Sequence, residues 1–494
     1  MERRLAVIDC GSNSFRLVVF TYTDTWWKRT DEIHEAVRVG EGLEATGELQ
    51  PAPMERALET LELYAHFCSA TGIDEIRPVA TSAIRDAGNQ AEFLRLARER
   101  SGLTVEVLPG PAEARYGYLA AVNSTTLWNG VVLDLGGGSM QLTRVRKRLA
   151  DDARSWPLGA VRMTERFNPG RKKATRALQK HVADELRSAD WLGEGGRLVA
   201  VGGTVRNLAA AAQLAEGLPS YGIQGYFVSR DALGELIERF SGMDPAERGQ
   251  VAGVKASRGD LILAGALVID AVLEAGGFEG FEATEAGLRE GVFFERLHPE
   301  GLSSDVRRDA VLNLAAQYHA DFVHSEHVAR LALEMWDALG AAGLHRGDLE
   351  ERELVWATGM LHDIGVAVDY DDHHKHSRYL ILSAGLPGFS PRETALIGQA
   401  ARYHRKGSPS LGEFSSVVAS GDAARLDRIA ACVRLAEQLE RSRDQSVHSC
   451  EVRLRNGTVE LELQASGDVR IARWAAERQG DLFKRAFDRE LSVS

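Results

Sequence analysis

The sequence has few cysteines and no long apolar run, and each shortage excludes a class of protein. Only four cysteines occur in 494 residues, at scattered positions without paired spacing. This usage is typical of a reducing compartment rather than of a disulfide-stabilised secreted protein. No apolar stretch is long enough to span a bilayer, and the first residues lack the features of a signal peptide. We therefore expect a cytoplasmic protein without a membrane partner.

Basic residues are too few for a protein that binds nucleic acid nonspecifically. The formal net charge is −12, from 59 Lys and Arg against 71 Asp and Glu, and such binding usually depends on a basic surface. We expect no nucleic-acid partner. A polyanionic substrate stays compatible with this charge if basic residues gather locally, although solvated surfaces explain the two basic clusters equally well. These clusters are Arg144, Arg146, Lys147 and Arg148, and Arg171, Lys172, Lys173, Arg176 and Lys180.

The length and the order of patterns predict several domains. A chain of this length exceeds what one hydrophobic core usually supports, so we expect roughly three or four domains. The first 297 residues alternate short apolar strands with helices, which is typical of α/β domains. Residues 298–304 have the composition of a linker, and the chain beyond them is mostly helical and rich in histidine. We expect domains at 1–125, 126–297, 305–443 and 446–494.

The end of the chain predicts a hairpin and one helix. Alternating strands flank Asn456-Gly457, a pair of residues that favours a tight hairpin turn. A terminal helix that carries Ile471, Trp474, Leu482, Phe483 and Phe487 is expected to cover this hairpin.

One sequence element occurs twice in the α/β region. A strand ends in Asp9 and is followed by a turn with Gly and Ser, and a second strand ends in Asp134 before a similar turn. The two aspartates lie 125 positions apart (134 − 9), about one domain length. Backbone N–H groups of such turns cradle phosphate, and Asp can hold Mg²⁺ directly or through water. Two turns that face each other could hold one phosphoryl group from both sides, whereas either Asp alone could simply satisfy a turn.

A third glycine-rich turn follows a strand at residues 198–201 and precedes a helix. It could complete the far wall of the same site. The candidate metal ligands are Asp9 and Asp134, with Mg²⁺ or Mn²⁺ as the ion. The candidate phosphate-binding residues are Gly11, Ser12, Asn13, Ser14, Gly136, Gly137, Gly138, Ser139, Gly202, Gly203 and Thr204.

Six motifs in the first 297 residues resemble those of the exopolyphosphatase/guanosine-pentaphosphatase (Ppx/GppA) phosphatases. They occur in the family's order: residues 9–17 (DCGSNSFRL), 80–89 (ATSAIRDAGN), 134–139 (DLGGGS), 200–204 (AVGGT), 258–266 (RGDLILAGA) and 287–291 (GLREG). The resemblance implies an α/β fold with two actin-like, sugar-kinase-like (ribonuclease H-like) domains and an active site in the cleft between them. An all-α HD-like domain and a small α+β domain are expected to follow.

The resemblance also implies roles for individual residues. Glu113, in the segment PAEAR at 111–115, matches the family's catalytic base, although without the family it would be read as a glutamate that favours a helix start. Arg85 is the candidate for neutralising the phosphoryl oxygens, and Thr81 and Ser82 join the phosphate-binding set. One departure stands out: the family usually has Glu where this chain has Gln141, which puts a second metal contact in doubt and favours a changed substrate preference.

Residues from about 319 to 443 resemble an HD-type domain, as in the longer members of the family. The candidate ligands of a second metal ion are His327, His362, Asp363 and His404, with Glu437 where metal-binding HD domains usually carry Asp. Imidazole and carboxylate groups suit Mn²⁺, Fe²⁺ or Zn²⁺. The alternative is a degenerate scaffold that packs, forms a homodimer, or supplies cations to a polyphosphate channel through residues 402–406 (RYHRK).

The leading hypothesis is an Mg²⁺-dependent exopolyphosphatase that removes terminal phosphate from inorganic polyphosphate as orthophosphate. A guanosine pentaphosphate 5′-phosphohydrolase shares every motif, so the sequence does not separate the two substrates. An actin-like sugar or acetate kinase would need an adenosine pocket and an acceptor site. A non-catalytic polyphosphate or nucleotide sensor is the third alternative, and Gln141 is the best argument for it.

Overall fold

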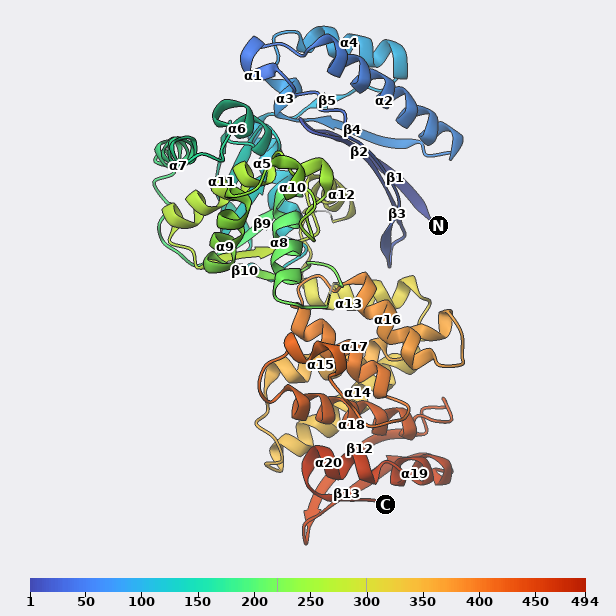
Figure 1. Ribbon diagram of the computed structural model, residues 1–494. Helices are drawn as coiled ribbons and strands as arrows, with labels where there is room; N and C mark the ends of the chain where they lie inside the picture. Colours follow the sequence, from blue (N-terminus) through green and yellow to red (C-terminus); the bar gives the residue numbers. More distant parts are fainter. Residues whose placement is uncertain (220, 299) are drawn as a thin grey trace. The chain divides into compact units, whose positions relative to one another are not determined.

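The computed structural model describes residues 1–219, 221–298 and 300–494, and the chain forms two compact units, Met1–Val306 and Arg307–Ser494 (Figure 1). The first unit contains two mixed β-sheets with helices around them. The second unit is mostly helical and ends in a small sheet.

The first sheet has the strand order β3-β2-β1-β4-β5. The neighbours β1/β2 and β2/β3 are antiparallel, and β1/β4 and β4/β5 are parallel. In β1, Ala6 and Ile8 enter one core, and Leu5 and Val7 enter another. Both faces of the sheet are therefore covered, which explains the continuous apolar run of this strand. The strands are β1 (Arg3–Cys10), β2 (Phe15–Tyr22), β3 (Trp27–Glu35), β4 (Glu75–Ala80) and β5 (Glu106–Val107).

The second sheet repeats this arrangement. Its order is β10-β11-β9-β6-β7-β8, so that β6, β7, β8, β9 and β11 take the places of β1 to β5 with the same parallel and antiparallel pairings. The strand β10 is an added antiparallel edge. The strands are β6 (Gly130–Leu135), β7 (Met140–Arg146), β8 (Leu149–Trp156), β9 (Arg197–Val201), β10 (Phe227–Ser229) and β11 (Gly280–Ala283).

The helices of the first unit cover the outer faces of both sheets and fill the space between them. The helices α2 and α4 lie on the first sheet (Figure 1), α7, α8, α9 and α11 pack on the second, and α5 and α12 share a core with both. The helices are α1 (Leu43–Thr46), α2 (Pro51–Ala70), α3 (Ser82–Arg85), α4 (Gln90–Ser101), α5 (Gly110–Val122), α6 (Ala160–Phe167), α7 (Lys172–Leu186), α8 (Gly203–Ala215), α9 (Arg230–Ser241), α10 (Pro245–Arg248), α11 (Ile262–Gly276) and α12 (Leu288–Leu297), with a 3₁₀ turn at Ala256–Arg258.

The central helices α5 and α12 touch through glycine. A Cβ atom on Gly291 of α12 would lie 2.0 Å from the carbonyl oxygen of Tyr116 on α5. Only glycine allows the two backbones to approach this closely. Because α5 also packs on β6, β7, β8 and β9, this contact ties the position of its N-terminal turn to both sheets.

The segment expected to be a linker is anchored to α5. The side-chain amide of Asn123, at the end of α5, donates to the carbonyl oxygen of Gly301 at 2.7 Å and accepts from the backbone N–H of Ser303 at 2.8 Å. Residue 299, which belongs to the same expected linker, lies outside the described residues. The described part of this segment is thus attached to the first unit.

The second unit has one large helical core that extends onto a three-stranded sheet. Its helices are α13 (Val306–Gln317), α14 (Phe322–Ala341), α15 (Leu349–Leu361), α16 (His373–Ala384), α17 (Pro391–Tyr403), α18 (Asp422–Leu439), α19 (Arg470–Glu477) and α20 (Gly480–Phe487), with 3₁₀ turns at Ile364–Ala367 and Gly412–Ser416. Its strands are β12 (Val447–Arg455), β13 (Thr458–Ala465) and β14 (Glu490–Val493). Within the described ranges, no helix combines the length and the apolar character needed to cross a membrane.

The hairpin expected around Asn456-Gly457 is confirmed, because β12 and β13 pair in antiparallel register directly across this turn. The prediction of a single terminal helix was wrong. The helices α19 and α20 are separate, and β14 follows them as a third strand. Ile471 and Trp474 on α19 are 57% and 60% exposed, since alanines form the buried face of that helix. The large apolar residues of α20 do enter the core, as expected.

Candidate active site

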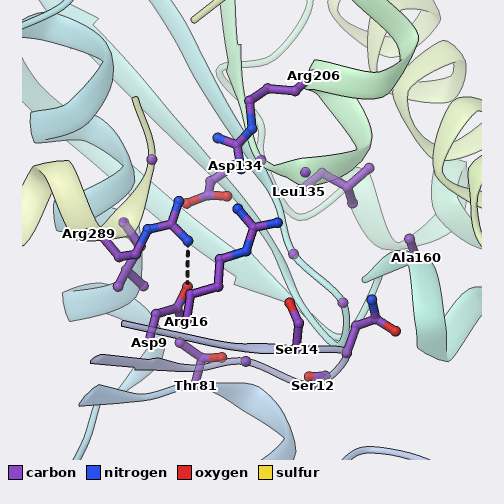
Figure 2. A pocket seen from close by; sticks show the side chains of 18 of the residues that line it. Asp9, Ser12, Ser14, Arg16, Thr81, Asp134, Leu135, Ala160, Arg206 and Arg289 are labelled. Atoms are coloured by element: carbon purple, nitrogen blue, oxygen red, sulfur yellow. Dashed lines mark ion pairs between the residues drawn. The ribbon is translucent and has the colours of Figure 1, made fainter. Parts of the chain in front are cut away.

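A cavity of about 110 Å³ lies in the first unit, where β1 and β6 reach their carboxyl ends (Figure 2). Asp9 and Asp134 occupy the next-to-last positions of these two strands. Both sheets contribute to the lining, which is made of Asp9, Gly11, Ser12, Asn13, Ser14, Arg16, Thr81, Glu113, Asp134, Leu135, Gly136, Gly137, Ala160, Gly202, Gly203, Arg206, Arg258, Leu261, Gly287, Leu288 and Arg289.

The two Asp-led turns lie against each other beside this cavity. A Cβ atom on Gly138 would lie 2.4 Å from Oγ of Ser82 and 2.8 Å from Oγ of Ser12, so the approach requires glycine. The same two hydroxyl groups are 3.2 Å apart and hydrogen bonded. The backbone of the turn after Asp134 and the hydroxyl groups of Ser12 and Ser82 therefore form a continuous wall that offers donors to an anion.

Glu113 projects into the cavity from the first turn of α5, and its side chain is almost completely buried. Its Oε2 accepts a hydrogen bond from Nη1 of Arg85 at 2.7 Å, and its Oε1 accepts one from Oγ of Ser139 at 2.8 Å. Burial raises the pKa of the Glu113 carboxyl, and the two hydrogen bonds partly oppose this rise. The result is an oriented carboxyl group whose pKa is moved toward neutrality.

Arg85 occupies a different place from the one expected. It is not among the residues that line the cavity, and its guanidinium donates to Glu113 and to the carbonyl oxygen of Leu108 at 2.9 Å. This position gives it a role in holding the carboxylate rather than a direct contact with phosphoryl oxygens.

Four other arginines supply the positive charge of the cavity. They come from separate elements: Arg16 from β2, Arg206 from α8, Arg258 from a 3₁₀ turn and Arg289 from α12. Figure 2 shows Arg16, Arg206 and Arg289 pointing toward one another and toward the two aspartates. Burial, together with the charges of Arg289 and Arg16, lowers the pKa of Arg206 to about 9. Crowded like charges in a buried site favour a bound anion strongly.

These arginines were missed at the sequence level. Arg16, Arg258 and Arg289 lie inside motifs that carry the family resemblance, but nothing in one linear motif shows that its arginine meets the others. For Arg206, the one signal in the sequence was its position, two residues after the third glycine-rich turn. The two basic clusters, which the sequence left open as a polyanion-binding region or as solvated surfaces, contribute no residue to the described lining of this cavity.

The two aspartates form an oxygen-rich site next to the arginines. Burial raises the pKa of Asp134 to about 7, and the charges of Glu113 and Asp9 add to this. Burial also raises the pKa of Asp9, against the opposing charge of Arg289, whose Nη1 lies 3.8 Å from Oδ2. A divalent cation would relieve the repulsion among three neighbouring carboxylates, and oxygen donors suit Mg²⁺. The residues present therefore fit the expected ion.

The remaining predicted residues lie close behind the lining. The hydroxyl group of Ser82 is hydrogen bonded to that of Ser12, and the hydroxyl group of Ser139 donates a hydrogen bond to Glu113. Thr204 is buried behind the Gly202-Gly203 turn, where a Cβ atom on Gly265 would lie 2.4 Å from its Cγ2. Thr81 lines the cavity directly.

Gln141 lies opposite Asp134 in the ladder between β6 and β7. Its side chain is buried, its Nε2 donates to Oγ of Ser155 at 3.0 Å, and its Oε1 has no hydrogen-bond partner in the described structure. The same position in the first sheet, opposite Asp9, holds Arg16. The residue that departs from the family pattern thus lies beside the cavity and does not line it.

In the second unit, three of the four candidate metal ligands lie together and the fourth does not. His362, Asp363 and His404 form one buried group with His324, His373 and Glu437. His327 lies outside this group, because its Nε2 is 2.9 Å from the carbonyl oxygen of Val447 and therefore donates to it.

The fold and the cavity define a two-sheet α/β protein with a site suited to an anion. The sequence profile of the Ppx/GppA phosphatase family matches residues 19–300, and that of Ppx/GppA phosphatase domain III matches residues 306–477. The chain therefore belongs to the Ppx/GppA phosphatase family, in its long form.

Individual relatives agree with this assignment. The chain is 27% identical over 475 residues, 94% of its length and 90% of the relative's, to a guanosine-5′-triphosphate,3′-diphosphate pyrophosphatase of Vibrio vulnificus. The crystal structure of a Ppx/GppA family member from Aquifex aeolicus is 27% identical, with a TM-score of 0.52 over 61% of this chain and all of that one. An exopolyphosphatase from Cytophaga hutchinsonii shares the fold, with a TM-score of 0.56 over 61% of this chain and 99% of that one at 22% identity.

Proposed function

We propose that the cavity between the two sheets hydrolyses terminal phosphoanhydride bonds, and that inorganic polyphosphate is its main substrate. The observation that carries this proposal is the convergence of four arginines and an oriented, buried carboxylate on one small cavity. Phosphoryl transfer requires little beyond positioning and charge neutralisation, and these groups supply both.

In the proposed reaction, Glu113 takes a proton from a water molecule as the water oxygen bonds to the terminal phosphorus. The bond from phosphorus to the bridging oxygen breaks, and the shortened chain leaves with that electron pair. Arg85 and Ser139 keep the carboxylate of Glu113 directed at the water. Burial raises the pKa of this carboxyl, and a more basic carboxylate accepts a proton from water more readily.

Asp9 and Asp134 would hold Mg²⁺, which when bound neutralises charge on the phosphoryl oxygens. The arginines Arg16, Arg206 and Arg289 would bind the terminal and penultimate phosphates through their planar donor groups. The backbone of the glycine-rich turns would close the remaining sides.

We favour polyphosphate over a nucleotide as the substrate because of the residues that line the cavity. Its described lining has glycine, serine, threonine, asparagine, arginine, carboxylate and aliphatic residues, with no aromatic side chain on which a base could stack. The second candidate is guanosine pentaphosphate 5′-phosphohydrolase activity, which the relationship to the Vibrio vulnificus pyrophosphatase favours. We also propose that the first unit has the actin-like fold, as the repeated strand order supports, and that the helices of the second unit are HD-like.

The test is a comparison of initial rates on long-chain polyphosphate and on guanosine pentaphosphate, with Mg²⁺ present. We expect orthophosphate release from both, with the larger kcat/KM on polyphosphate. A larger value on guanosine pentaphosphate would replace the first substrate by the second. Tight binding of either compound without phosphate release would instead support the sensor.

A further inference from the structure

The second unit contains a buried group of six side chains that the proposed hydrolysis does not use. They come from five helices or their ends: His324 from α14, His362 and Asp363 from the end of α15, His373 from α16, His404 from the end of α17 and Glu437 from α18. These six residues are called the histidine cluster below. Their exposed fractions are small, with His362 at 0% and His404 at 1%.

Three of the histidines are fixed in the same tautomer by the backbone. Their Nδ1 atoms lie 2.7 to 2.8 Å from carbonyl oxygens of residues three positions earlier, namely Gly359, Tyr370 and Ala401. A carbonyl oxygen only accepts, so Nδ1 of each ring carries the hydrogen. In the neutral form, Nε2 of His362, His373 and His404 therefore presents a lone pair to the centre of the cluster.

The centre of the cluster consequently brings acceptors together. Nε2 of His373 lies 3.2 Å from Nε2 of His404, and these two atoms are 3.2 and 3.5 Å from Oδ1 of Asp363. Nε2 of His362 is 3.3 Å from Oε2 of Glu437, to which Nε2 of His324 is 3.0 Å. Facing lone pairs and carboxylates repel one another unless a positive charge lies between them.

Partner groups do not resolve this repulsion. Oδ1 of Asp363 and Nδ1 of His324 are buried, and they make no hydrogen bond within the described structure. Such groups are rare in folded proteins unless an ion or water takes the missing place. Arg443 does contact Asp363, but through Oδ2 at 2.6 Å, which leaves Oδ1 facing His373 and His404.

We propose that the histidine cluster binds two divalent transition-metal ions that share Asp363. Two groups of ligand atoms, each within 4.8 Å of one another, overlap at this residue: His324, His362 and Asp363, and Asp363, His373 and His404. Glu437 supplies a further oxygen to the first position. Imidazole with carboxylate suits Mn²⁺, Fe²⁺ or Zn²⁺ rather than Mg²⁺. Metal-binding histidines usually donate a hydrogen bond from the ring nitrogen that does not bind the metal, and Nδ1 of these three rings donates to a backbone carbonyl oxygen in this way.

This ligand set differs from the one that the sequence suggested. His327 is excluded because its Nε2–H donates to the carbonyl oxygen of Val447, and Nη2 of Arg330 lies 3.1 Å from its Nδ1. His324 takes its place, one helical turn earlier on α14. His327 is therefore a matched control: a buried histidine on the same helix that should not affect metal binding.

The test uses the full chain with Asp134→Asn, so that metal bound at the other site does not contribute. The protein is stripped with a chelator, loaded with Mn²⁺ or Zn²⁺, freed of excess ion, and analysed for metal per chain and for thermal unfolding. We expect about two ions per chain. Saturating metal should raise the Tm of the second unit by roughly 5 °C or more, since an ion that binds only the folded state stabilises it.

Variants assign the ions to the cluster. Asp363→Asn should lose both ions, His404→Gln about one, and His324→Gln the other, while His327→Gln should keep both and its Tm rise. Circular dichroism verifies the fold of each variant. Less than one ion per chain and no Tm shift in the starting protein would show a network of protonated histidines instead, and that measurement decides the question even if Asp363→Asn does not fold. Equal loss in His327→Gln and His404→Gln would overturn the ligand set.

Discussion

The two polar centres of this protein are built in opposite ways. In the first unit, short contiguous turns supply several groups each, and four arginines from separate elements face three carboxylates. In the second unit, four helices supply one side chain each, the end of α15 supplies two, and acceptors face acceptors. The first centre is poised for an anion and the second for cations.

The two centres also differ in the hydrogen bonds that support their side chains. The carboxylate of Glu113 is already satisfied by Arg85 and Ser139, so this part of the cavity is organised before a ligand arrives. Asp363 and His324 keep buried atoms without hydrogen bonds. We therefore expect changes in the first unit to alter rate more than stability, and metal removal in the second unit to alter stability more than rate.

The largest effect should come from Glu113→Gln. The amide keeps the shape of the side chain but cannot accept a proton, and general-base catalysis typically contributes about 10²–10⁴-fold. We expect kcat on polyphosphate to fall by that factor while binding of polyphosphate is retained. Steady-state rates and a direct binding measurement check this. The control is Glu99→Gln, an exposed position on α4 whose ion pair with Arg95 is worth little. An unchanged rate in Glu113→Gln would remove it as the base.

Gly117→Ala should have the next largest effect. Gly117 lies one turn after Glu113 on α5, and a Cβ atom there would be 2.6 Å from Oδ2 of Asp134. The added methyl group must move the carboxylate or the helix, at a cost of about 1–3 kcal/mol. We expect at least a tenfold lower kcat/KM.

A matched control for this change is Gly234→Ala on α9, where no atom lies within 4 Å of the new Cβ. Because alanine restricts the unfolded chain more than glycine does, this control should gain about 0.4–1 kcal/mol of stability with unchanged rate. Chemical unfolding of both variants provides the measurement. Equal behaviour of the two variants would contradict the proposed contact between α5 and Asp134.

A third prediction concerns Arg85, which we interpret as a positioning residue. Its hydrogen bond and charge lower the pKa of Glu113 against the rise caused by burial. In Arg85→Gln that pKa should therefore rise, and because the base works only when ionised, the acidic limb of the pH–rate profile should move to higher pH. Arg85→Lys keeps a positive charge and a donor at this position, so it should show only part of the shift. If Arg85 instead contacted the substrate directly, KM would increase at every pH and the acidic limb would not move.

The sequence predicted local parts of the first centre better than their assembly. The strands before Asp9 and Asp134 and the glycine turns after them could be read directly, because each is a short contiguous pattern. The convergence of Arg16 with Arg206 could not be predicted, since it depends on how two sheets lie around α5.

The second centre shows the same limit on a smaller scale. His324 and His327 lie three residues apart on α14, and both are buried. Only packing against the backbone at Val447 shows that one of them is already used as a donor. A linear pattern can therefore predict that a helix supplies a histidine without showing which one faces the cluster.

The smallest effect should come from a change at Gln141, where the chain departs from the family pattern. This residue is opposite Asp134 in the second sheet, as Arg16 is opposite Asp9 in the first. Gln141→Glu would place another buried carboxylate near Asp134, whose pKa is already raised to about 7 by burial and by neighbouring carboxylates. A further negative charge should raise that pKa and increase the benefit of a bound cation.

We therefore expect Gln141→Glu to show a several-fold stronger dependence on Mg²⁺ and a lower rate at limiting Mg²⁺. Rates measured over a range of Mg²⁺ concentrations check this, with Gln141→Met as the uncharged control of similar length. An identical Mg²⁺ dependence in Gln141→Glu and the unaltered chain would mean that this position does not influence the aspartate pair. The asymmetry between the two sheets, arginine in one and glutamine in the other, would then have no bearing on metal binding.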